Sequence, residues 1–238
     1  LLLCAAGALE CLSLWHERRL PWALALSWVC FTSAGLIKVI PLLWLGLPLL
    51  LVQLSSNPQG QAPPLQTLPG RVLRLLGRPG FWLYIGTSLM AIAGWYWHAH
   101  QLGQTSGLSF GFWGSGADRS SISLLLDLNG WVNLLLRVSL RLLALVGVPF
   151  LLIGLRASWR NGGGQIAISG LVGVLLCTIA TMRSSTIHEY HQLPLLLFSS
   201  PLIGLGWRTW HQRRRRWQPR LLLGLALVVS LSVLSMDY

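Results

Sequence analysis

The chain has 238 residues, of which 53% are hydrophobic and only 10% are charged, and its mean hydropathy is +0.60. A soluble domain carries about 25% charged residues, so this composition argues against a soluble protein and is typical of a multi-pass membrane protein. The net charge of +12 comes mostly from arginines in short segments between apolar runs. The positive-inside rule explains that distribution more simply than binding to nucleic acid does.

Eight apolar segments follow one another along the chain, and we expect each to form a helix. They are residues 1–14, 22–37, 39–54, 81–97, 134–155, 165–180, 194–207 and 221–236. A run of about 16 residues gives about 24 Å of helix, which is short but feasible for a span. The sequence therefore predicts an all-α fold, a polytopic transmembrane helix bundle of about eight spans that forms a single transmembrane domain over residues 1–238.

Residues 22–54 are too long for one span, because a helix of that length would reach about 50 Å. Gly35, Lys38 and Pro41 predict a tight turn that divides this stretch into a helical hairpin. The chain begins with Leu1 inside an apolar run, and no basic region precedes "LLLCAAG". We therefore expect no signal peptide, and we expect an amino-terminal part with a first outer loop upstream of Leu1.

The basic residues predict the orientation. If residues 15–20 are cytoplasmic, so are residues 55–80, 156–164 and 208–220, and these segments hold 13 of the 18 Lys and Arg residues. Residues 55–80 are predicted to be a Pro/Gln-rich cytoplasmic linker, and "HQRRRRWQPR" an anchor beside acidic lipid headgroups, with no role in binding nucleic acid. Residues 98–133 are then predicted to form an outer loop and an amphipathic helix.

Four of the six histidines fall on the non-cytoplasmic side, namely His98, His100, His188 and His191. In "RSSTIHEYHQLPLLLF" (residues 183–198) ionisable groups crowd against an apolar run. A zinc protease needs HExxH, whereas His188 and His191 are only three residues apart and Pro194 follows closely. The four cysteines lie inside apolar runs without CxxC spacing and are expected to be core thiols. We therefore predict no metal site.

The same stretch suits contact with an anionic headgroup, because its donors could hydrogen-bond phosphate oxygens at the membrane surface. These donors are Arg183, His188, Tyr190 and His191. The alternative left open is that they only cap two helices and meet headgroup water. Lys38 also has two interpretations, a phosphate contact or a side chain that reaches from the end of the hairpin to water.

A polar stripe precedes the apolar segment that starts at Leu142, since polar residues recur there every four positions. They are Asn129, Asn133, Arg137 and Arg141. The favoured interpretation is an amphipathic helix that lies along the interface. The other is that both arginines face an internal cavity that holds a lipid phosphate.

Two stretches, "WYWHAHQLGQTSGLSFGFWG" and "HEYHQLPLLLFSSPLIGLGW", resemble the outer-face loops of GT-C-type glycosyltransferases. The branch they resemble is the dolichyl-phosphate-mannose–protein mannosyltransferase-like family, with its bacterial aminoarabinose–lipid A transferase relatives. Bacterial members often show H-x-Y-Y-Q-L-P before an apolar helix, and here His191 replaces the second Tyr. "AGLIKVIPLLWLGLPLLLV" is similar to the family's short hairpin, in which a Lys precedes a helix that contains Pro and Gly.

The resemblance implies transfer of a sugar from a polyprenyl-phosphate-linked donor to a lipid, glycan or protein on the non-cytoplasmic face of the plasma (inner) membrane. This chemistry needs a general base for the acceptor hydroxyl and cationic contacts for the departing phosphate. The family's base lies in the first outer loop, so it is expected upstream of Leu1 and is carried onto neither Glu189 nor Asp118. The implied donor contacts are Lys38, Arg183, His188, Tyr190 and His191, and also His98 and His100.

Two other classes of function stay open. A transporter or flippase for a lipid-linked or small anionic substrate would line its path with the same outer residues, although such proteins usually show symmetric repeats and charged groups in mid-membrane. A non-catalytic membrane subunit would lack the carboxylate base altogether. No cofactor is required by the residues, and a divalent cation stays open.

Overall fold

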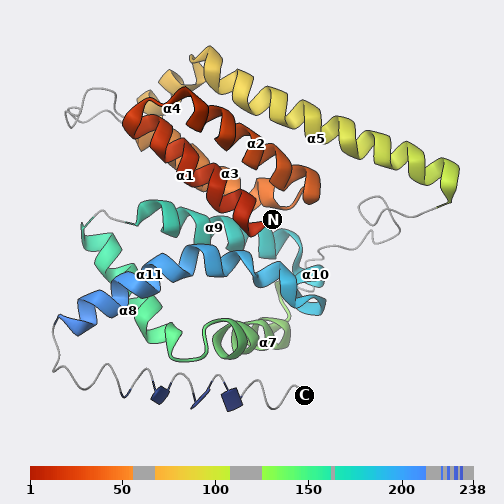
Figure 1. Cartoon of the computed structure of the whole chain (residues 1–238). Coiled ribbons are helices and arrows are strands. Elements are labelled where there is room, and N and C mark those ends of the chain that lie inside the picture. Colours follow the sequence, from red (N-terminus) through yellow and green to blue (C-terminus); the bar gives the residue numbers. More distant parts are fainter. Residues whose placement is uncertain are drawn as a thin grey trace. The chain divides into compact units, whose positions relative to one another are not determined.

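The computed structural model describes residues 1–55, 68–107, 125–161 and 164–212, and a few positions beyond them (221, 224–225, 228–229 and 231–232). The described residues form helices and turns, with no strand among them, so the all-α prediction is confirmed for this part of the chain (Figure 1). The chain divides into two compact units, unit 1 (Leu1–Ala117) and unit 2 (Asp118–Tyr238). Each is described by itself, and the single domain over 1–238 stays a prediction.

The described residues of unit 1 form five helices: α1 (Leu2–Arg18), α2 (Pro21–Ile37), α3 (Pro41–Ser55), α4 (Leu68–Leu76) and α5 (Pro79–Ser106). Three of them begin with proline, which has no N–H to lose and a fixed φ that suits the first helical position. Lys38 ends α2 in an extended conformation, with φ −158° and ψ 133°. The predicted turn between residues 37 and 41, and with it the helical hairpin, is therefore confirmed.

Hydroxyl groups join α2 to its neighbours inside unit 1. The Ser27 hydroxyl donates to the Ala8 carbonyl at 2.8 Å and lies 3.0 Å from the Tyr84 hydroxyl. The Thr32 hydroxyl donates to Ser88 Oγ at 3.0 Å. Because the partners advance together along both helices, α2 and α5 run parallel. Such hydrogen bonds between helices satisfy polar groups where water is absent and fix the helix register.

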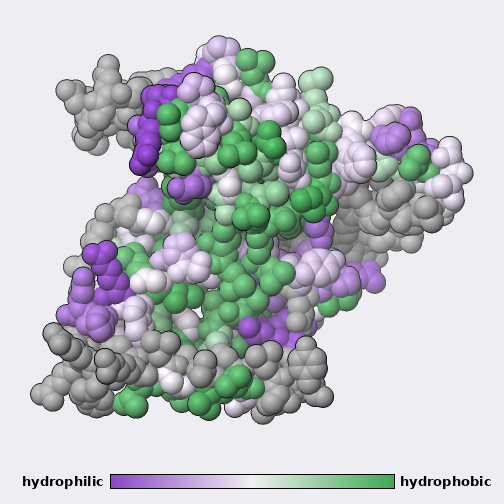
Figure 2. Space-filling view, in the orientation of Figure 1, coloured by the Kyte–Doolittle hydropathy of each residue, from purple (hydrophilic) through white to green (hydrophobic). Residues whose placement is uncertain are grey.

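Near the carboxyl end of α1, His16 Nε2 lies 3.2 Å from Gln53 Oε1 of α3. Burial lowers the pKa of His16 to about 4, and the positive charges of Arg19 and Arg78 lower it further, while the hydrogen bond to Gln53 acts to raise it. His16 is therefore a neutral imidazole at pH 7. Figure 2 shows hydrophilic side chains gathered where α1 ends, with hydrophobic ones over much of the rest of this face of unit 1.

Unit 2 begins with α7 (Leu128–Arg137) and a π-helix, η1 (Val138–Leu142), followed by α8 (Gly147–Asn161) and α9 (Gln165–Ala180). A short α10 (Met182–Ile187), a 3-10 turn, η2 (Glu189–Gln192), and α11 (Pro194–His211) follow. The predicted apolar helices at 165–180 and 194–207 are confirmed, the second with four further residues at its carboxyl end.

Two glycines let α8 and α11 pack backbone against backbone. A Cβ on Gly154 would overlap the Leu202 carbonyl oxygen, and a Cβ on Gly206 would overlap that of Phe150. Because both obstacles are backbone atoms, neither can rotate away. This contact sets the distance between the two helices.

The predicted span at 134–155 is wrong as a single helix. The chain changes to a π-helix at Val138, turns at residues 143–146, and resumes at Gly147. Ala144 and Leu145 have left-handed φ values of 48° and 54°, a conformation that costs about 1–2 kcal/mol per residue. Pro149, in the first turn of α8, favours the break, because its ring would clash with the Leu145 carbonyl in a continuous helix, although α3 and α11 continue through Pro48 and Pro201.

Two other predicted boundaries change. A helix, α4, forms at the end of the predicted linker 55–80. The predicted outer loop starts later than residue 98, because α5 continues to Ser106 and ends before Gly107, which adopts φ 70°. Residues 108–124 and most of segment 221–236 lie outside the described residues.

Within the described ranges, no single helix has both the length and the apolar composition needed to cross a membrane. Residues Leu128–Leu142 and Gly147–Trp159 meet that requirement only as a pair, with a bend of 97° between them. Shorter apolar helices lie at Pro21–Ile37, Leu42–Leu54 and Gln165–Ala180.

The first prediction concerns the α8–α11 contact. Gly206→Ala should lower the free energy of unfolding by about 1–3 kcal/mol, because the added methyl group meets a backbone carbonyl that cannot move aside. Gly204→Ala is the matched control, since a Cβ there meets nothing within 4 Å. Thermal unfolding of both purified variants measures the difference, and equal midpoints would contradict the close approach.

The second prediction concerns pH. Unfolded His16 binds a proton near pH 6.5 but the folded protein binds it only near pH 4, so between these values protons favour the unfolded state. The free energy of unfolding should fall as the pH is lowered from 6.5 to about 4, with no further effect of this group outside that window. Melting curves of the wild type and of His16→Gln at several pH values measure it, and parallel pH profiles would contradict it.

Candidate functional site

The candidate site is the connection between α9 and α11, which the sequence had marked by its crowded polar groups. Instead of an open loop, it is a compact helical turn made of α10 and η2. His188 separates the two in an extended conformation, with φ −110° and ψ 115°. Pro194 then occupies the first position of α11, as expected for a residue without an N–H.

Three rings gather on this turn, and we call His188, Tyr190 and His191 the ring cluster. The His188 and Tyr190 rings stack with their centroids 5.2 Å apart and an interplanar angle of 22°. The His191 ring centroid lies 4.5 Å from that of Tyr190 and 6.1 Å from that of His188. His188 and Tyr190 are exposed and His191 is half-buried. The cluster thus presents flat surfaces and N–H and O–H donors outward.

Gln192 fixes the turn from its buried side. Its side chain is buried, and Nε2 donates to the Ser185 carbonyl at 3.1 Å. The Ser185 hydroxyl lies 3.2 Å from Thr181 Oγ1, which in turn donates to the Cys177 carbonyl at 2.8 Å. Gln192 Oε1 is buried and has no hydrogen-bond partner in the structure. The sequence analysis missed this role, although a lone amide at the start of an apolar helix was a usable signal.

Arg137 connects α7 to the same turn. Its Nη1 donates to the Thr186 carbonyl at 3.0 Å, and its side chain is half-buried. The helix predicted from the polar stripe is present as α7, with the Asp127 carboxylate capping it by accepting from the Asn129 N–H at 3.0 Å, and its place along the membrane interface stays a prediction. The Arg137 side chain contacts the turn instead of solvent, whereas the Arg141 side chain is exposed on the π-helix. Sequence reasoning missed this contact because 49 positions separate its partners.

The other predicted site residue of unit 2, Arg183, lies in α10 with its side chain exposed. Among the described residues, no group of three or more His, Cys, Asp or Glu side chains is arranged to hold a metal ion. The chemistry that the turn offers is therefore hydrogen bonding, positive charge and ring stacking.

In unit 1, Lys38 is half-buried at the turn between α2 and α3. The Tyr96 hydroxyl of α5 is hydrogen-bonded to the backbone of Val39 beside it. His98 and His100 lie on α5 itself, not on a loop. Because residues two apart on a helix point to nearly opposite sides, these two imidazoles do not converge on one ligand. His98 is exposed, and His100 Nε2 lies 3.1 Å from Gln104 Nε2.

Comparison with known proteins adds no family to this geometry. No family model, curated protein or solved structure matches the chain. The resemblance to GT-C-type transferases therefore stays an expectation that rests on the quoted residues.

The third prediction tests the role of Arg137. Arg137→Gln removes a charged hydrogen bond worth about 1.5 kcal/mol, so amide exchange in α10 should become roughly tenfold faster. Arg141→Gln, the next arginine of the stripe, is the control and should leave α10 unchanged. Hydrogen–deuterium exchange of peptides that cover residues 181–193 measures both. Equal protection in the two variants would show that Arg137 does not hold the turn.

Proposed function

We propose that this chain forms the donor side of a multi-pass membrane glycosyltransferase. The enzyme would move a sugar from a polyprenyl-phosphate carrier to a lipid, glycan or protein acceptor on the non-cytoplasmic face of the plasma membrane. The observation that carries the proposal is the ring cluster, in which three rings with hydrogen-bonding groups lie within 4.5–6.1 Å of one another on a braced, exposed turn.

The ring cluster suits both halves of such a donor. The exposed, flat ring surfaces offer stacking to the apolar face of a sugar, while imidazole and phenol donors offer hydrogen bonds to phosphate oxygens. A departing phosphate gains negative charge, which donors already in place stabilise without further reorganisation. In this proposal His188 and Tyr190 of unit 2 contact the donor, and Arg183 of the same unit supplies positive charge. Lys38 of unit 1 is proposed separately, as a phosphate contact of its own unit. We assign the base for the acceptor hydroxyl to no residue of this chain.

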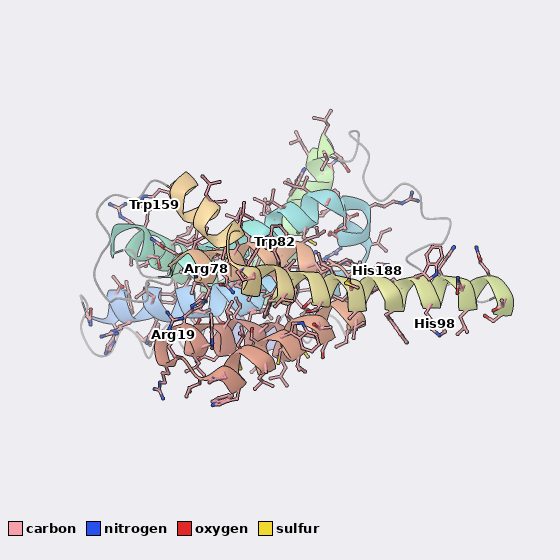
Figure 3. All side chains as sticks on the ribbon, turned by 90° about the horizontal axis from the view of Figure 1, so that it is seen from above. Arg19, Arg78, Trp82, His98, Trp159 and His188 are labelled. Atoms are coloured by element: carbon pink, nitrogen blue, oxygen red, sulfur yellow. The ribbon has the colours of Figure 1, made fainter. Side chains whose placement is uncertain are left out.

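Charge distribution within unit 1 supports the orientation that this role needs. Arg18 and Arg19 lie where α1 ends, and Arg78 lies where α5 begins. Lys38 ends α2, which runs parallel to α5, and His98 lies near the other end of α5 (Figure 3). Arginines at one end with Lys38 and His98 toward the other match a cytoplasmic and a non-cytoplasmic side.

The fourth prediction is made for the complete protein in its membrane. His188→Ala and Lys38→Ala should each lower sugar-dependent release of polyprenyl phosphate from the donor by about tenfold or more, the cost of one lost transition-state contact. His211→Ala is the matched control, since that exposed imidazole ends α11 away from the turn. Wild-type rates in both test variants, at equal membrane content, would remove this site assignment.

A transporter or flippase is the second candidate, and one observation favours it. Discontinuous helices are typical of transporter binding sites, and residues Leu128–Leu142 and Gly147–Trp159 form such a bent pair. Proteoliposomes loaded with a labelled polyprenyl-phosphate sugar separate the two functions. A transferase cleaves the sugar from its carrier when acceptor is supplied, whereas a flippase moves the intact lipid between leaflets.

A further inference from the structure

A second arrangement of charged groups lies where α1 and α3 end and α5 begins in unit 1. Arg19 follows α1 in a left-handed conformation, with φ 55° and ψ 33°, and its guanidinium carbon lies 5.4 Å from the Trp15 ring centroid. Arg78 stands immediately before α5 as its N-cap. Figure 3 shows both arginines at the same end of unit 1.

Arg19 and Arg78 lie at the same end of unit 1 (Figure 3), and the positive charge of each acts on the His16 imidazole. Arg19 and Arg78 each lower the pKa of His16, which burial already holds well below its ordinary value. His16 is anchored through Nε2 to Gln53, and its buried Nδ1 has no hydrogen-bond partner in the structure. Because His16 stays neutral, it does not add a third charge between the two arginines.

The two charges are not balanced by the part of the protein that the structure describes. No described carboxylate forms an ion pair with Arg19 or Arg78, and Glu17, the nearest acidic residue in sequence, is exposed. Two guanidinium groups that share one neighbour repel each other, and a bound anion would turn that repulsion into attraction. Arginine suits this role because its planar fork of N–H groups matches two oxygens of a phosphate.

The surroundings are those of a lipid headgroup rather than of an aqueous anion site. Trp22 and Trp82 are each 55% exposed, and Leu83, next to Trp82, is 66% exposed. The Trp82 indole donates to the Leu76 carbonyl at 2.7 Å, which fixes this ring against the end of α4. Exposed tryptophans beside arginines are the residues that proteins place at the level of lipid headgroups.

We infer that Arg19 and Arg78 together bind the phosphate group of an anionic phospholipid at the cytoplasmic end of unit 1. The site is separate from the ring cluster and does not depend on the transferase chemistry. It needs only that this end of unit 1 faces a lipid surface. Free inorganic phosphate would make the same contacts as the phosphate of a lipid headgroup. The experiment therefore tests the lipid and inorganic phosphate separately.

The fifth prediction is tested on the full chain, purified in neutral detergent and titrated with phosphatidylglycerol or phosphatidylcholine. Wild-type protein should show a thermal midpoint that rises with phosphatidylglycerol only. Arg19→Gln and Arg78→Gln should each need about tenfold more of this lipid for the same rise, because each removes one of two charged contacts. Arg18→Gln, the exposed neighbour that does not act on His16, is the control and should change the requirement less than about twofold.

Other outcomes would overturn the inference. An equal effect of Arg18→Gln would mean diffuse attraction instead of a two-arginine site. An equal response to phosphatidylcholine, or saturation by inorganic phosphate at the same concentration, would exclude an anionic lipid as the specific ligand. If a Gln variant does not fold, Arg19→Lys and Arg78→Lys replace it, since they keep the charge and lose the fork, and they should bind roughly threefold to tenfold more weakly. None of these outcomes bears on sugar transfer, which the His188→Ala assay measures.

Discussion

The close approach of α8 and α11 at Gly154 and Gly206 is the constraint on which the candidate site depends. Backbone meets backbone there, so α11 can neither slide nor rotate without a clash. Because α11 starts at Pro194, directly after the ring cluster, its position also sets where those rings lie. α9 packs against α11 as well, with the Phe198 side chain lying over Gly170. The small residues of α8, α9 and α11 therefore position the helix that follows the turn, while Gln192 and Arg137 hold the turn itself.

The positions of proline residues account for much of where the helices begin and end. Pro194 marks a helix start that was predicted correctly, whereas the helix predicted from residue 39 begins at Pro41; at both positions the missing N–H costs nothing in the first turn. Pro149 was not considered in the apolar run 134–155, and it lies directly after the break in the predicted span, in the first turn of α8. α5 exceeds its prediction because "HAHQLGQTS" is polar but contains no residue that prevents a helix before Gly107. Hydropathy alone marks where a helix is buried, not where it ends.

The site shows a different limit. The crowding of polar groups at 183–193 could be seen in the sequence, as could the polar stripe of α7, but their connection could not. Arg137 meets Thr186 across 49 positions, and nothing local to either residue indicates the other. In the same way, the polar contacts of unit 1 join Ser27 to Tyr84 and Thr32 to Ser88. In a chain this apolar, an isolated polar side chain inside a helix indicates that another helix packs against it at that point. It does not indicate which helix that is.

The bent stretch from α7 to α8 bears on both candidate functions, and its chemistry favours the transferase. A transporter uses a broken helix to expose backbone groups or ionisable side chains to its substrate. Here the residues at the break are apolar: Leu143 is buried, and Ala144, Leu145 and Val146 carry no polar side chain. The arginines nearest the break, Arg137 and Arg141, precede it, and the next described one, Arg156, lies more than two turns into α8. Arg137 is already engaged with the Thr186 carbonyl. The break is thus better explained as the means by which α7 reaches the turn before α11, where its arginine braces the ring cluster, than as a place where an anion binds.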